Sequence, residues 1–287
     1  VDDIAAAANV MRQKAQTIKA PDIAMDIVGT GGDGFGTYNI STACAFVVAG
    51  CGIPVAKHGN KAVSSKSGAA DVLSSLGIKL DCDMSLVERA LVEANITFLM
   101  APRHHAAMRH VGPTRAALGV RTIFNLLGPL SNPALVKRIM VGVFDQSYCA
   151  SFAHVLAQLG ATHAWVVHGA DGLDEVSTTG KTHVAALHNG TVTEFTISPD
   201  DIGLRTASLD QLRGGDGDHN ARYLRALLEG ETGPYHDVVL FNAAAALVAG
   251  GHAEDLQEAA IQAQEALDSG KALAALDNLI AITNDKA

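Results

Sequence analysis

Short runs of apolar residues alternate along the chain with longer segments in which apolar residues recur every three or four positions. The short runs are typical of buried strands, and the longer segments are typical of amphipathic helices. The pattern predicts strands over 23–28, 53–56, 96–100, 137–144 and 163–168, and a hairpin over 182–197. It predicts helices over 2–18, 41–51, 67–76, 85–94, 103–110, 113–118, 121–127, 147–159, 218–229 and 252–268, while 236–248 fits a strand or a helix. This alternation indicates an α/β fold with a mostly parallel central sheet flanked by helices.

Polar residues and glycines mark the ends of several predicted helices. Ser67 and Ser85 are candidate N-caps, and Glu88 would complete a capping box with Ser85. Gly128-Pro129 is expected to end the helix over 121–127, because proline disrupts a helix interior.

The segment 103–130 contains several arginines and no predicted strand. We therefore expect it to leave the sheet and join the N-terminal helix in a small all-helical domain. The resulting division is 1–20, a remnant of the small helical domain; 21–102 and 131–287, the two parts of a large α/β domain; and 103–130, the joining segment. Val1 is not a start methionine, so most of the small domain is expected to precede it.

Composition narrows the class of protein. The chain has 287 residues, 48% of them hydrophobic, which is enough for one large or two ordinary domains with a core. No apolar run reaches the roughly 18 residues that would span a membrane, and no signal peptide precedes the first helix. Four scattered cysteines without a C-x-x-C pair predict free thiols and a cytoplasmic location.

The distribution of charge is more informative than its sum. A net charge of −9 argues against a protein that binds nucleic acid or a membrane surface. Two long segments nevertheless contain no acidic residue, namely 34–70 and 94–144. Their basic residues are Lys57, Lys61, Lys66, Arg103, Arg109, Arg115, Arg121, Lys137 and Arg138. Each of these side chains alone could belong to a solvated surface, but two such segments together predict the walls of one anion-binding cleft.

The most informative segment follows the first strand and contains five glycines within residues 29–36. Glycine allows positive φ and a close approach of the backbone to a ligand. The N–H groups of such a loop, and those of the helix that begins after it, are suited to bind phosphate oxygens. Ser41 and Thr42 could cap this helix or bind a metal ion with their hydroxyls.

Two common phosphate-binding patterns do not explain this loop. The G-x-x-x-x-G-K-[ST] pattern fails because Phe35 stands where lysine is required. A G-x-G-x-x-G pattern is present over 29–34, but the acidic residue expected about 20 positions later is missing, since no acid lies between Asp33 and Asp71. A nicotinamide-dependent enzyme is therefore disfavoured, and a polyanionic ligand is favoured.

A second polar loop, over 57–68, follows the next predicted strand, where ligands bind in open α/β sheets. Its lysines and serines have no acidic neighbour, so it is either a second phosphate-binding wall or an ordinary polar connection. A third polar segment, 171–175, carries the adjacent acids Asp174 and Glu175 after a buried strand. Adjacent carboxylates repel each other unless they are solvated or bind a cation. Oxygen ligands suit Mg²⁺, and the alternative is a surface turn.

Histidine and arginine residues offer weaker indications. The chain has 12 histidines, but none lies at a spacing typical of zinc ligands. Arg115 lies among apolar residues, and arginine is well suited to bind a planar carboxylate through two hydrogen bonds. Its alternative role is an ordinary position on a helix surface.

Taken together, these segments resemble the anthranilate phosphoribosyltransferase family. The motifs that carry the resemblance are Gly29-Thr-Gly-Gly-Asp33, Asn39-Ile-Ser-Thr42, Lys57-His-Gly-Asn60 with Ser64-Ser65, Arg121 to Leu130 with Asn132-Pro133, Asp174-Glu175, and Gly214-Gly215 with Asn220-Ala221. The resemblance implies an enzyme of tryptophan biosynthesis that joins anthranilate to phosphoribosyl pyrophosphate (PRPP) and releases pyrophosphate. It also implies a homodimer formed through the small helical domain, with 21–102 as a PRPP-binding part of the large domain.

The resemblance also implies roles for individual residues. It places PRPP on Gly29, Gly32, Asp33, Thr37, Asn39, Ile40, Ser41, Thr42, Lys57, His58, Gly59, Asn60, Ser64 and Ser65. It places anthranilate on Gly29, Asn60, His105, Arg115 and Pro129, and two Mg²⁺ ions per subunit on Ser41, Asp174 and Glu175. Lys57 and Asp33 are the implied catalytic residues.

The chain departs from the family pattern at two positions in the second loop. Ala69 stands where the family often has a serine that contacts PRPP, so that contact is not expected here. Lys61 replaces a more usual arginine, which keeps the charge but loses the paired hydrogen bonds. The alternatives are a pyrimidine nucleoside phosphorylase-like enzyme of the same fold, and a non-catalytic relative that binds nucleic acid. The glycine loop and the acid pair disfavour the first, and the net charge disfavours the second.

The expected chemistry follows from the substrates. The amine of anthranilate is a weak nucleophile, so the reaction should be driven by departure of pyrophosphate from an oxocarbenium-like ribose. Neutralisation of the leaving group by Mg²⁺, Lys57 and loop N–H groups is then more important than a general base.

Overall fold

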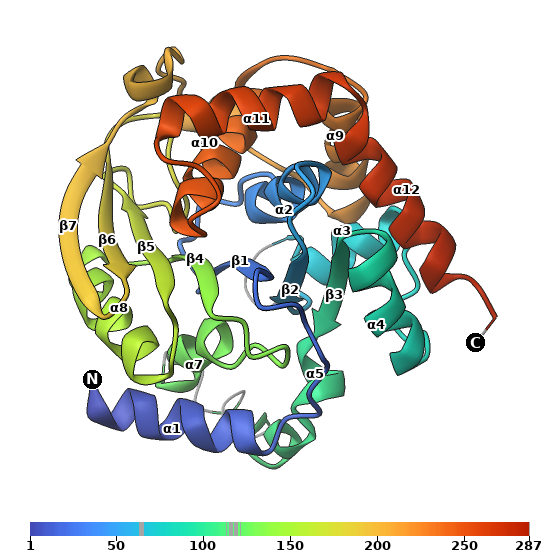
Figure 1. Cartoon of the computed structure of the whole chain (residues 1–287), viewed down its shortest axis with the longest axis vertical. Helices are drawn as coiled ribbons and strands as arrows, with labels where there is room; N and C mark the ends of the chain where they lie inside the picture. Colours follow the sequence, from blue (N-terminus) through green and yellow to red (C-terminus); the bar gives the residue numbers. More distant parts are fainter. Residues whose placement is uncertain (63–65, 113, 115–116, 118–119, 121, 287) are drawn as a thin grey trace.

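The computed structural model describes residues 1–62, 66–112, 114, 117, 120 and 122–286. Its centre is a seven-stranded sheet with the order β3-β2-β1-β4-β5-β6-β7 (Figure 1). The strands are β1 (Met25–Gly29), β2 (Val55–Gly59), β3 (Ile96–Met100), β4 (Arg138–Gly142), β5 (His163–Gly169), β6 (Thr182–His188) and β7 (Thr191–Ile197). The first five strands are mutually parallel, and β6 and β7 add an antiparallel hairpin at one edge. The predicted α/β fold with a mostly parallel sheet is confirmed.

Helices cover both faces of the sheet (Figure 1). One face is covered by α2 (Ile40–Gly50), α10 (Pro234–Ala249), α11 (Leu256–Asp268) and α12 (Lys271–Thr283), with α3 (Ala69–Ser75), α4 (Met84–Glu93) and α9 (Gly217–Leu228) toward the β3 side. The other face is covered by α1 (Asp2–Gln13), α5 (Ala101–His104), α7 (Phe124–Leu130) and α8 (Cys149–Gln158). Among the described residues, no helix combines the length and apolar character needed to cross a membrane.

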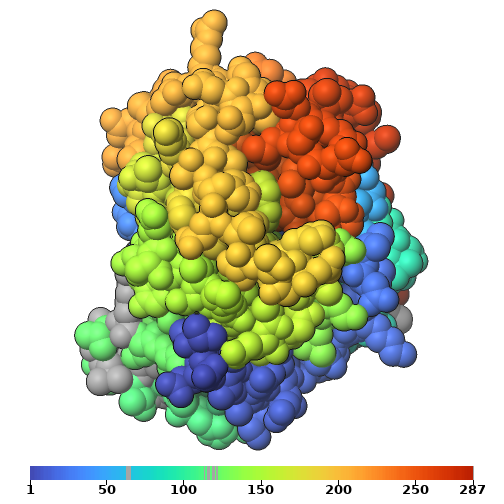
Figure 2. Space-filling view, turned by 60° about the vertical axis from the view of Figure 1, so that its left-hand side comes forward, coloured from blue at the N-terminus to red at the C-terminus, as the bar shows by residue number. Residues whose placement is uncertain are grey.

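Alternating side chains on the central strands build two cores. Met140 of β4 and Trp165 of β5 lie in the core beneath α2 and α10, whereas their neighbours Val141 and Val166 lie in the core beneath α8. Strands buried on both faces show nearly continuous apolar sequence, which is why they were recognisable as short apolar runs. At the far edge β7 is largely exposed, and Figure 2 shows the molecule from that side.

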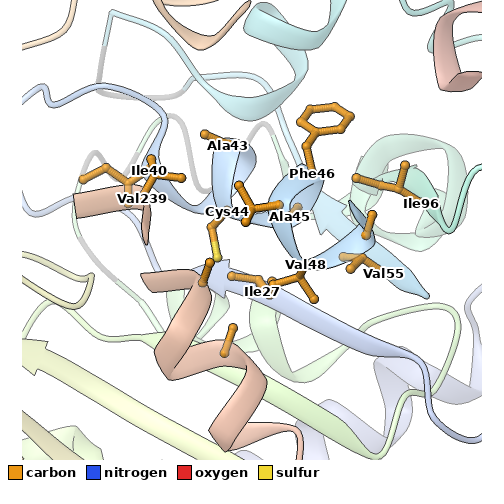
Figure 3. Close-up of a cluster of buried hydrophobic side chains, with 14 of the residues drawn as sticks. Ile27, Ile40, Ala43, Cys44, Ala45, Phe46, Val48, Val55, Ile96 and Val239 are labelled. Atoms are coloured by element: carbon orange, nitrogen blue, oxygen red, sulfur yellow. The ribbon is translucent and has the colours of Figure 1, made fainter. Parts of the chain in front are cut away.

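Helix α2 occupies the centre of the larger core. From Ile40 to Ala49 all but one of its residues are buried, so it has no polar face. Figure 3 shows Phe46 and Cys44 on opposite sides of this helix, with Ile27 of β1 below it and Val239 of α10 beside it. This packing fixes the N-terminus of α2 directly after the glycine-rich loop.

Helix α1 and α7 pack together on the second face of the sheet. Ala5 and Ala8 of α1 share the smaller core with Leu126 and Leu130 of α7. The Arg12 guanidinium donates hydrogen bonds to the carbonyls of Leu130 (2.7 Å) and Leu159 (2.9 Å).

The predicted strands were found with small shifts at their ends, but two predicted helix caps are wrong. Helix α3 has Gly68 at its N-cap rather than Ser67, and α4 has Asp83 rather than Ser85. Glu88 does not complete a capping box and instead accepts a hydrogen bond from a backbone amide outside the helix. The observed cap lies one residue after the predicted one in α3 and two residues before it in α4.

Other boundaries also differ from the prediction. Helix α7 continues through Gly128-Pro129 to Leu130, so these residues do not end it. The ambiguous segment 236–248 is helix α10, and α12 follows the last predicted helix. The first helix ends at Gln13, and 103–110 is divided between α5 and a 3₁₀ turn (Ala106–His110).

Candidate functional site

The order of the parallel strands reverses direction between β1 and β4. From β1 the chain proceeds outward to β2 and β3, and it then returns to the other side of β1 as β4 and β5. The carboxyl ends of the strands flanking such a switch point form a crevice in which ligands bind. The glycine-rich loop leaves β1 at this point, and the Lys57 loop leaves the neighbouring strand β2.

Two glycines make a notch at the switch point. Gly29 of β1 and Gly142 of β4 are register partners at the ends of their strands. A Cβ atom on Gly29 would lie 2.5 Å from Oδ2 of Asp174, and one on Gly142 would lie 1.6 Å from the carbonyl oxygen of Asp174. Neither position therefore accommodates a side chain while Asp174 keeps its place. The notch seats the first residue of the predicted acid pair, which is only 8% exposed.

The glycine-rich loop arches over this notch. Gly31, Gly32, Gly34 and Gly36 all have positive φ, a conformation that other residues rarely adopt. The backbone N–H of Gly31 donates a 2.6 Å hydrogen bond to Oδ2 of Asp174. The loop and the carboxylate thus support each other.

The end of the loop is bound to a distant segment, 212–220. The amide of Gly214 donates to Gly36, and the amide of Tyr38 donates to Leu212, so the two segments run as a short antiparallel pair. Tyr38 also stacks on Tyr235, with 4.4 Å between ring centroids.

Asn39, which precedes α2, is held in a side-chain network. Its Oδ1 accepts hydrogen bonds from Asn220 (2.8 Å) and from the hydroxyl of Ser67 (3.3 Å). Oδ1 of Asn220 in turn accepts from the amide of Gly215 at 2.7 Å. Asn220 appeared among the sequence motifs, but its pairing with Asn39 across 181 residues was not predictable.

Glu175 binds the N-terminus of α2. Its Oε1 accepts a 3.1 Å hydrogen bond from the backbone N–H of Ser41, one of the amides without an intrahelical partner. The carboxylate of Glu175 therefore caps α2, which was one of the two roles considered for the Ser41 and Thr42 hydroxyls. Thr42 is buried, and α2 has no capping hydrogen bond from the side chain of its own N-cap residue.

Lys57 reaches the same place from β2. It is 3% exposed, and its Nζ donates to the carbonyl of Ile27 (2.6 Å) and to the hydroxyl of Ser41 (3.4 Å). Burial lowers the pKa of Lys57, whereas the negative charges of Asp26 and Glu175 oppose this shift.

The acid pair has raised pKa values. Burial raises the pKa of Asp174 well above its usual range, and the charges of Glu175 and Asp33 raise it further. Burial also raises the pKa of Glu175, against the opposing effects of Lys57 and the Ser41 amide. The buried site therefore disfavours the charged forms of both carboxyls, and a bound cation would offset that effect.

Asp26 is a buried acid that the sequence prediction missed. It is fully buried on β1, accepts hydrogen bonds from the His58 amide (3.1 Å) and from Nδ2 of Asn132 (2.7 Å), and lies near Lys57. Burial raises its pKa to about 6, although the positive charge of Lys57 lowers it. Asp26 fixes the backbone from which Lys57 and His58 extend.

The donors near Asp174 suit a magnesium ion. Carboxylate oxygens of Asp174 and Glu175 and the hydroxyl of Ser41 are hard ligands of the kind that Mg²⁺ prefers. In the part of the chain that the structure describes, no group of three or more His, Cys, Asp or Glu residues has the geometry of a metal site. Mg²⁺ commonly keeps several waters and bridges to substrate phosphates, so two carboxylates and a hydroxyl suit it as protein ligands.

A second, less polar wall lies beside the Lys57 loop. The rings of His58 and His105 meet edge to face with centroids 5.2 Å apart, and Nδ1 of His58 lies 3.1 Å from the carbonyl of Gly128. Burial lowers the pKa of His58 to about 3, with a smaller effect from His105, so this imidazole is neutral. Buried Pro129 follows Gly128 directly in α7.

The structure thus brings many of the predicted residues to one crevice. These are Gly29, Asp33, Ser41, Lys57, His58, Asp174 and Glu175, with His105 and Pro129 on the adjoining wall. Thr37 pairs with Arg213 in the short antiparallel pair between the glycine-rich loop and segment 212–220, and Ile40 and Thr42 are buried in α2. Gly59 is the last residue of β2, and exposed Asn60 follows it. Ser64, Ser65 and Arg115 lie outside the described residues.

Comparison with known proteins identifies the family of the chain. Residues 21–273 match the family described as "Glycosyl transferase family, a/b domain". The chain is 59% identical to the anthranilate phosphoribosyltransferase of Azospirillum brasilense over 99% of this chain and 79% of that protein. It is 58% identical to the enzyme of Rhodospirillum rubrum over 98% of this chain and 81% of that one.

Solved structures give the same result. The anthranilate phosphoribosyltransferase of Thermus thermophilus is similar with a TM-score of 0.93 and 43% identity, covering 99% of this chain and 85% of that chain. The Saccharomyces cerevisiae enzyme in complex with PRPP and Mg has a TM-score of 0.90 and 34% identity, covering 98% of this chain and 79% of that chain. The fold is therefore that of solved anthranilate phosphoribosyltransferases.

Proposed function

This chain belongs to the anthranilate phosphoribosyltransferase family, and we propose that it transfers the phosphoribosyl group of PRPP to the amine of anthranilate in tryptophan biosynthesis, releasing pyrophosphate. The observation that carries the proposal is the crevice at the switch point. There a glycine loop, a helix N-terminus and Lys57 surround the carboxylates of Asp174 and Glu175. Loop amides and an ammonium suit phosphate oxygens, and the acid pair suits Mg²⁺.

The PRPP site is proposed to comprise the glycine loop, the N-terminus of α2 and the Lys57 loop, with Ser64 and Ser65 included by resemblance. Lys57 neutralises charge on the departing pyrophosphate, because its buried ammonium lies beside Ser41 at the N-terminus of α2. Asp33 lies close to Asp174, and its proposed role is to orient the glycine loop and the carboxylates that would hold the cation. When bound, Mg²⁺ at Ser41, Asp174 and Glu175 would supply charge stabilisation of several kcal/mol.

The anthranilate site is proposed to lie along the wall formed by His105 and Pro129, with Gly29 and Asn60 nearby. Neutral His58 and His105 provide flat aromatic surfaces for an aromatic ring. Arg115 is assigned to the carboxylate of anthranilate by resemblance. Alignment of the two substrates can supply roughly 7–11 kcal/mol of the barrier reduction, and no general base is required.

Three finer features also belong to the proposal. We propose two Mg²⁺ ions per subunit, a homodimer formed through the small helical domain, and a cytoplasmic location. The division of the chain into 1–20 and 103–130 on one side and 21–102 and 131–287 on the other is part of the same proposal. The packing of α1 against α7 supports the grouping of 1–20 with 103–130, and both helices also share the core beneath α8 with β4 and β5.

The test follows the fluorescence of anthranilate after addition of PRPP and MgCl₂. We expect fluorescence to be lost with the wild-type chain, because the product amine is substituted. The double variant Asp174→Asn with Glu175→Gln should need far more Mg²⁺ and turn over slowly, while anthranilate affinity changes little. A folded wild-type protein that never consumes anthranilate would refute the activity. A variant with unchanged Mg²⁺ dependence would refute the metal assignment alone.

A further inference from the structure

The connection from β5 to β6 carries both carboxylates of the candidate metal site. It begins after Gly169 and ends before Thr182. The connection is not a regular helix or strand, so the positions of Asp174 and Glu175 depend on whatever binds its backbone. Immediately after Glu175 comes Val176, which is fully buried.

A single side chain binds both polar groups of Val176. Asn242, on the inner face of α10, is fully buried. Its Oδ1 accepts a 3.0 Å hydrogen bond from the N–H of Val176, and its Nδ2 donates a 2.7 Å bond to the carbonyl of Val176. Nδ2 also donates to the carbonyl of Val238 one turn earlier at 2.8 Å. The Asn242 amide thus pairs with Val176 as a neighbouring strand would, and all its bonds are short.

We propose that Asn242 is a positioning residue that fixes the Asp174–Glu175 pair through the backbone of Val176. Helix α10 packs against β4 and β5, so Asn242 ties the acid pair to β4, the strand that carries Gly142 of the notch. This inference rests on the proposed function in one respect, namely that Asp174 and Glu175 bind the metal ion.

The rest of the connection is braced separately. Asp171 accepts hydrogen bonds from the amide of Leu173 and from the hydroxyls of Ser177 and Thr179. These bonds lie within the connection and maintain its local shape. Asn242 is different because it comes from another element, 66 residues from Val176, and sets where the whole connection sits.

Loss of Asn242 should therefore displace Glu175 without unfolding the connection. Asn242→Leu keeps a similar volume but leaves the buried N–H and carbonyl of Val176 without partners, a costly arrangement that favours movement toward water. Loss of residues that orient metal ligands typically reduces metal affinity or activity by about 10- to 100-fold. We expect the Mg²⁺ concentration for half-maximal turnover to rise by about that factor. The half-saturating anthranilate concentration should change by less than about twofold.

The matched control is Leu247→Ala on the same helix. Leu247 is fully buried and cannot hydrogen-bond the connection through its side chain, so this variant lowers stability without releasing Val176. Asn242→Asp is the second test variant if Asn242→Leu does not fold. It is nearly the same shape, and when ionised it loses both donors, so the Mg²⁺ requirement should rise as well.

Amide hydrogen exchange supplies a readout independent of turnover. The Ser41 amide is protected by Glu175, and Ser41 lies far along the chain from the mutated helix. Exchange at Ser41 and Val176 should accelerate at least tenfold in the Asn242 variants and stay near the wild-type rate in Leu247→Ala. The Asn242 variants and Leu247→Ala are compared at the same interval below their melting temperatures. Equal acceleration of exchange in the Asn242 variants and in Leu247→Ala would overturn the proposal. Unchanged exchange of the Ser41 amide in a folded Asn242 variant would overturn it as well. If Asp174→Asn with Glu175→Gln leaves the Mg²⁺ requirement unchanged, the metal assignment fails instead, and the Ser41 exchange still decides whether Asn242 positions Glu175.

Discussion

A single methyl group at Gly142 should disable the site. A Cβ on Gly142 would lie 1.6 Å from the carbonyl oxygen of Asp174, whereas real Cβ atoms essentially never come closer than 3.0 Å. The two groups must therefore separate by about 1.4 Å, the difference between those distances. Strand β4 is hydrogen-bonded on both sides, to β1 and to β5, so it cannot retreat. The connection that carries Asp174 must move instead.

The size of the effect follows from that displacement. A misplacement of about 1 Å in a catalytic constellation can cost roughly 100-fold in rate. We expect Gly142→Ala to lower kcat/KM by at least about 100-fold and to raise the Mg²⁺ requirement. Overpacking of this kind also destabilises folded proteins by about 1–3 kcal/mol, which leaves most domains folded at room temperature.

The assay is anthranilate fluorescence with PRPP and varied MgCl₂, and circular dichroism confirms that each variant is folded. Gly180→Ala is the matched control. Gly180 lies in the same connection, a Cβ there would meet nothing within 4 Å, and its φ is not positive. It should retain activity within about twofold of wild type. A folded Gly142→Ala variant with activity near that of Gly180→Ala would show that Asp174 does not need the notch.

Three further predictions concern charge. Lys57→Met keeps a side chain of similar length but removes the buried ammonium. It should reduce turnover by at least about 100-fold, with anthranilate binding unchanged in calorimetry. Normal turnover would exclude Lys57 from catalysis. His58 has its pKa lowered to about 3, below the roughly 6.5 of an unfolded chain, so its contribution to stability is full above about pH 6.5 and is lost as pH falls toward 3. The wild type should therefore lose about 1.4 kcal/mol per pH unit from this residue in urea unfolding below pH 6.5, and His58→Asn should lose less; equal slopes would contradict the assignment. Arg115→Ala should weaken anthranilate binding by about 10- to 150-fold in calorimetry and leave PRPP affinity nearly unchanged. Arg115→Lys should recover part of the anthranilate affinity. Equal loss of affinity for both ligands would rule out a specific contact with the carboxylate.

The sequence predicted the framework well because the central strands are buried on both faces. Such strands are short apolar runs between glycines and polar loops, a pattern that survives without knowledge of the partners. Helix α10 was ambiguous for the same reason, since it is buried almost all round and lacks the polar face that reveals a helix. The caps at Ser67 and Ser85 failed because several adjacent residues could begin each helix. The hydroxyl of Ser67 instead donates to Asn39, and the carboxylate of Glu88 accepts from the amide of Lys19.

The candidate site was predictable only where its chemistry is local. The glycine loop and the acid pair are continuous in sequence, and each motif suggests a ligand by itself. Asp26, Asn220 and Asn242 are isolated polar residues whose partners lie elsewhere along the chain. Asp26 meets Asn132 across 106 residues, Asn39 meets Asn220 across 181, and Val176 meets Asn242 across 66. A single sequence contains no periodicity that reports such pairs.

The positions of Asp174, Glu175 and Lys57 bear on how PRPP binding depends on the metal ion. A crevice for a pyrophosphate group would ordinarily exclude carboxylates, because like charges in a partly buried site repel strongly. Here Asp174 and Glu175 line the crevice, and burial raises the pKa of both because it disfavours their charged forms while no cation is bound. Without a cation, the polyanion would meet these two acids with the ammonium of Lys57 as the compensating buried charge. PRPP should consequently bind weakly to the metal-free protein, and its affinity should depend on divalent cations far more than that of anthranilate, whose proposed wall is lined by neutral imidazoles. The acid-free walls and the acid pair are therefore complementary, since the walls attract the polyanion and the pair makes its tight binding conditional on the cation.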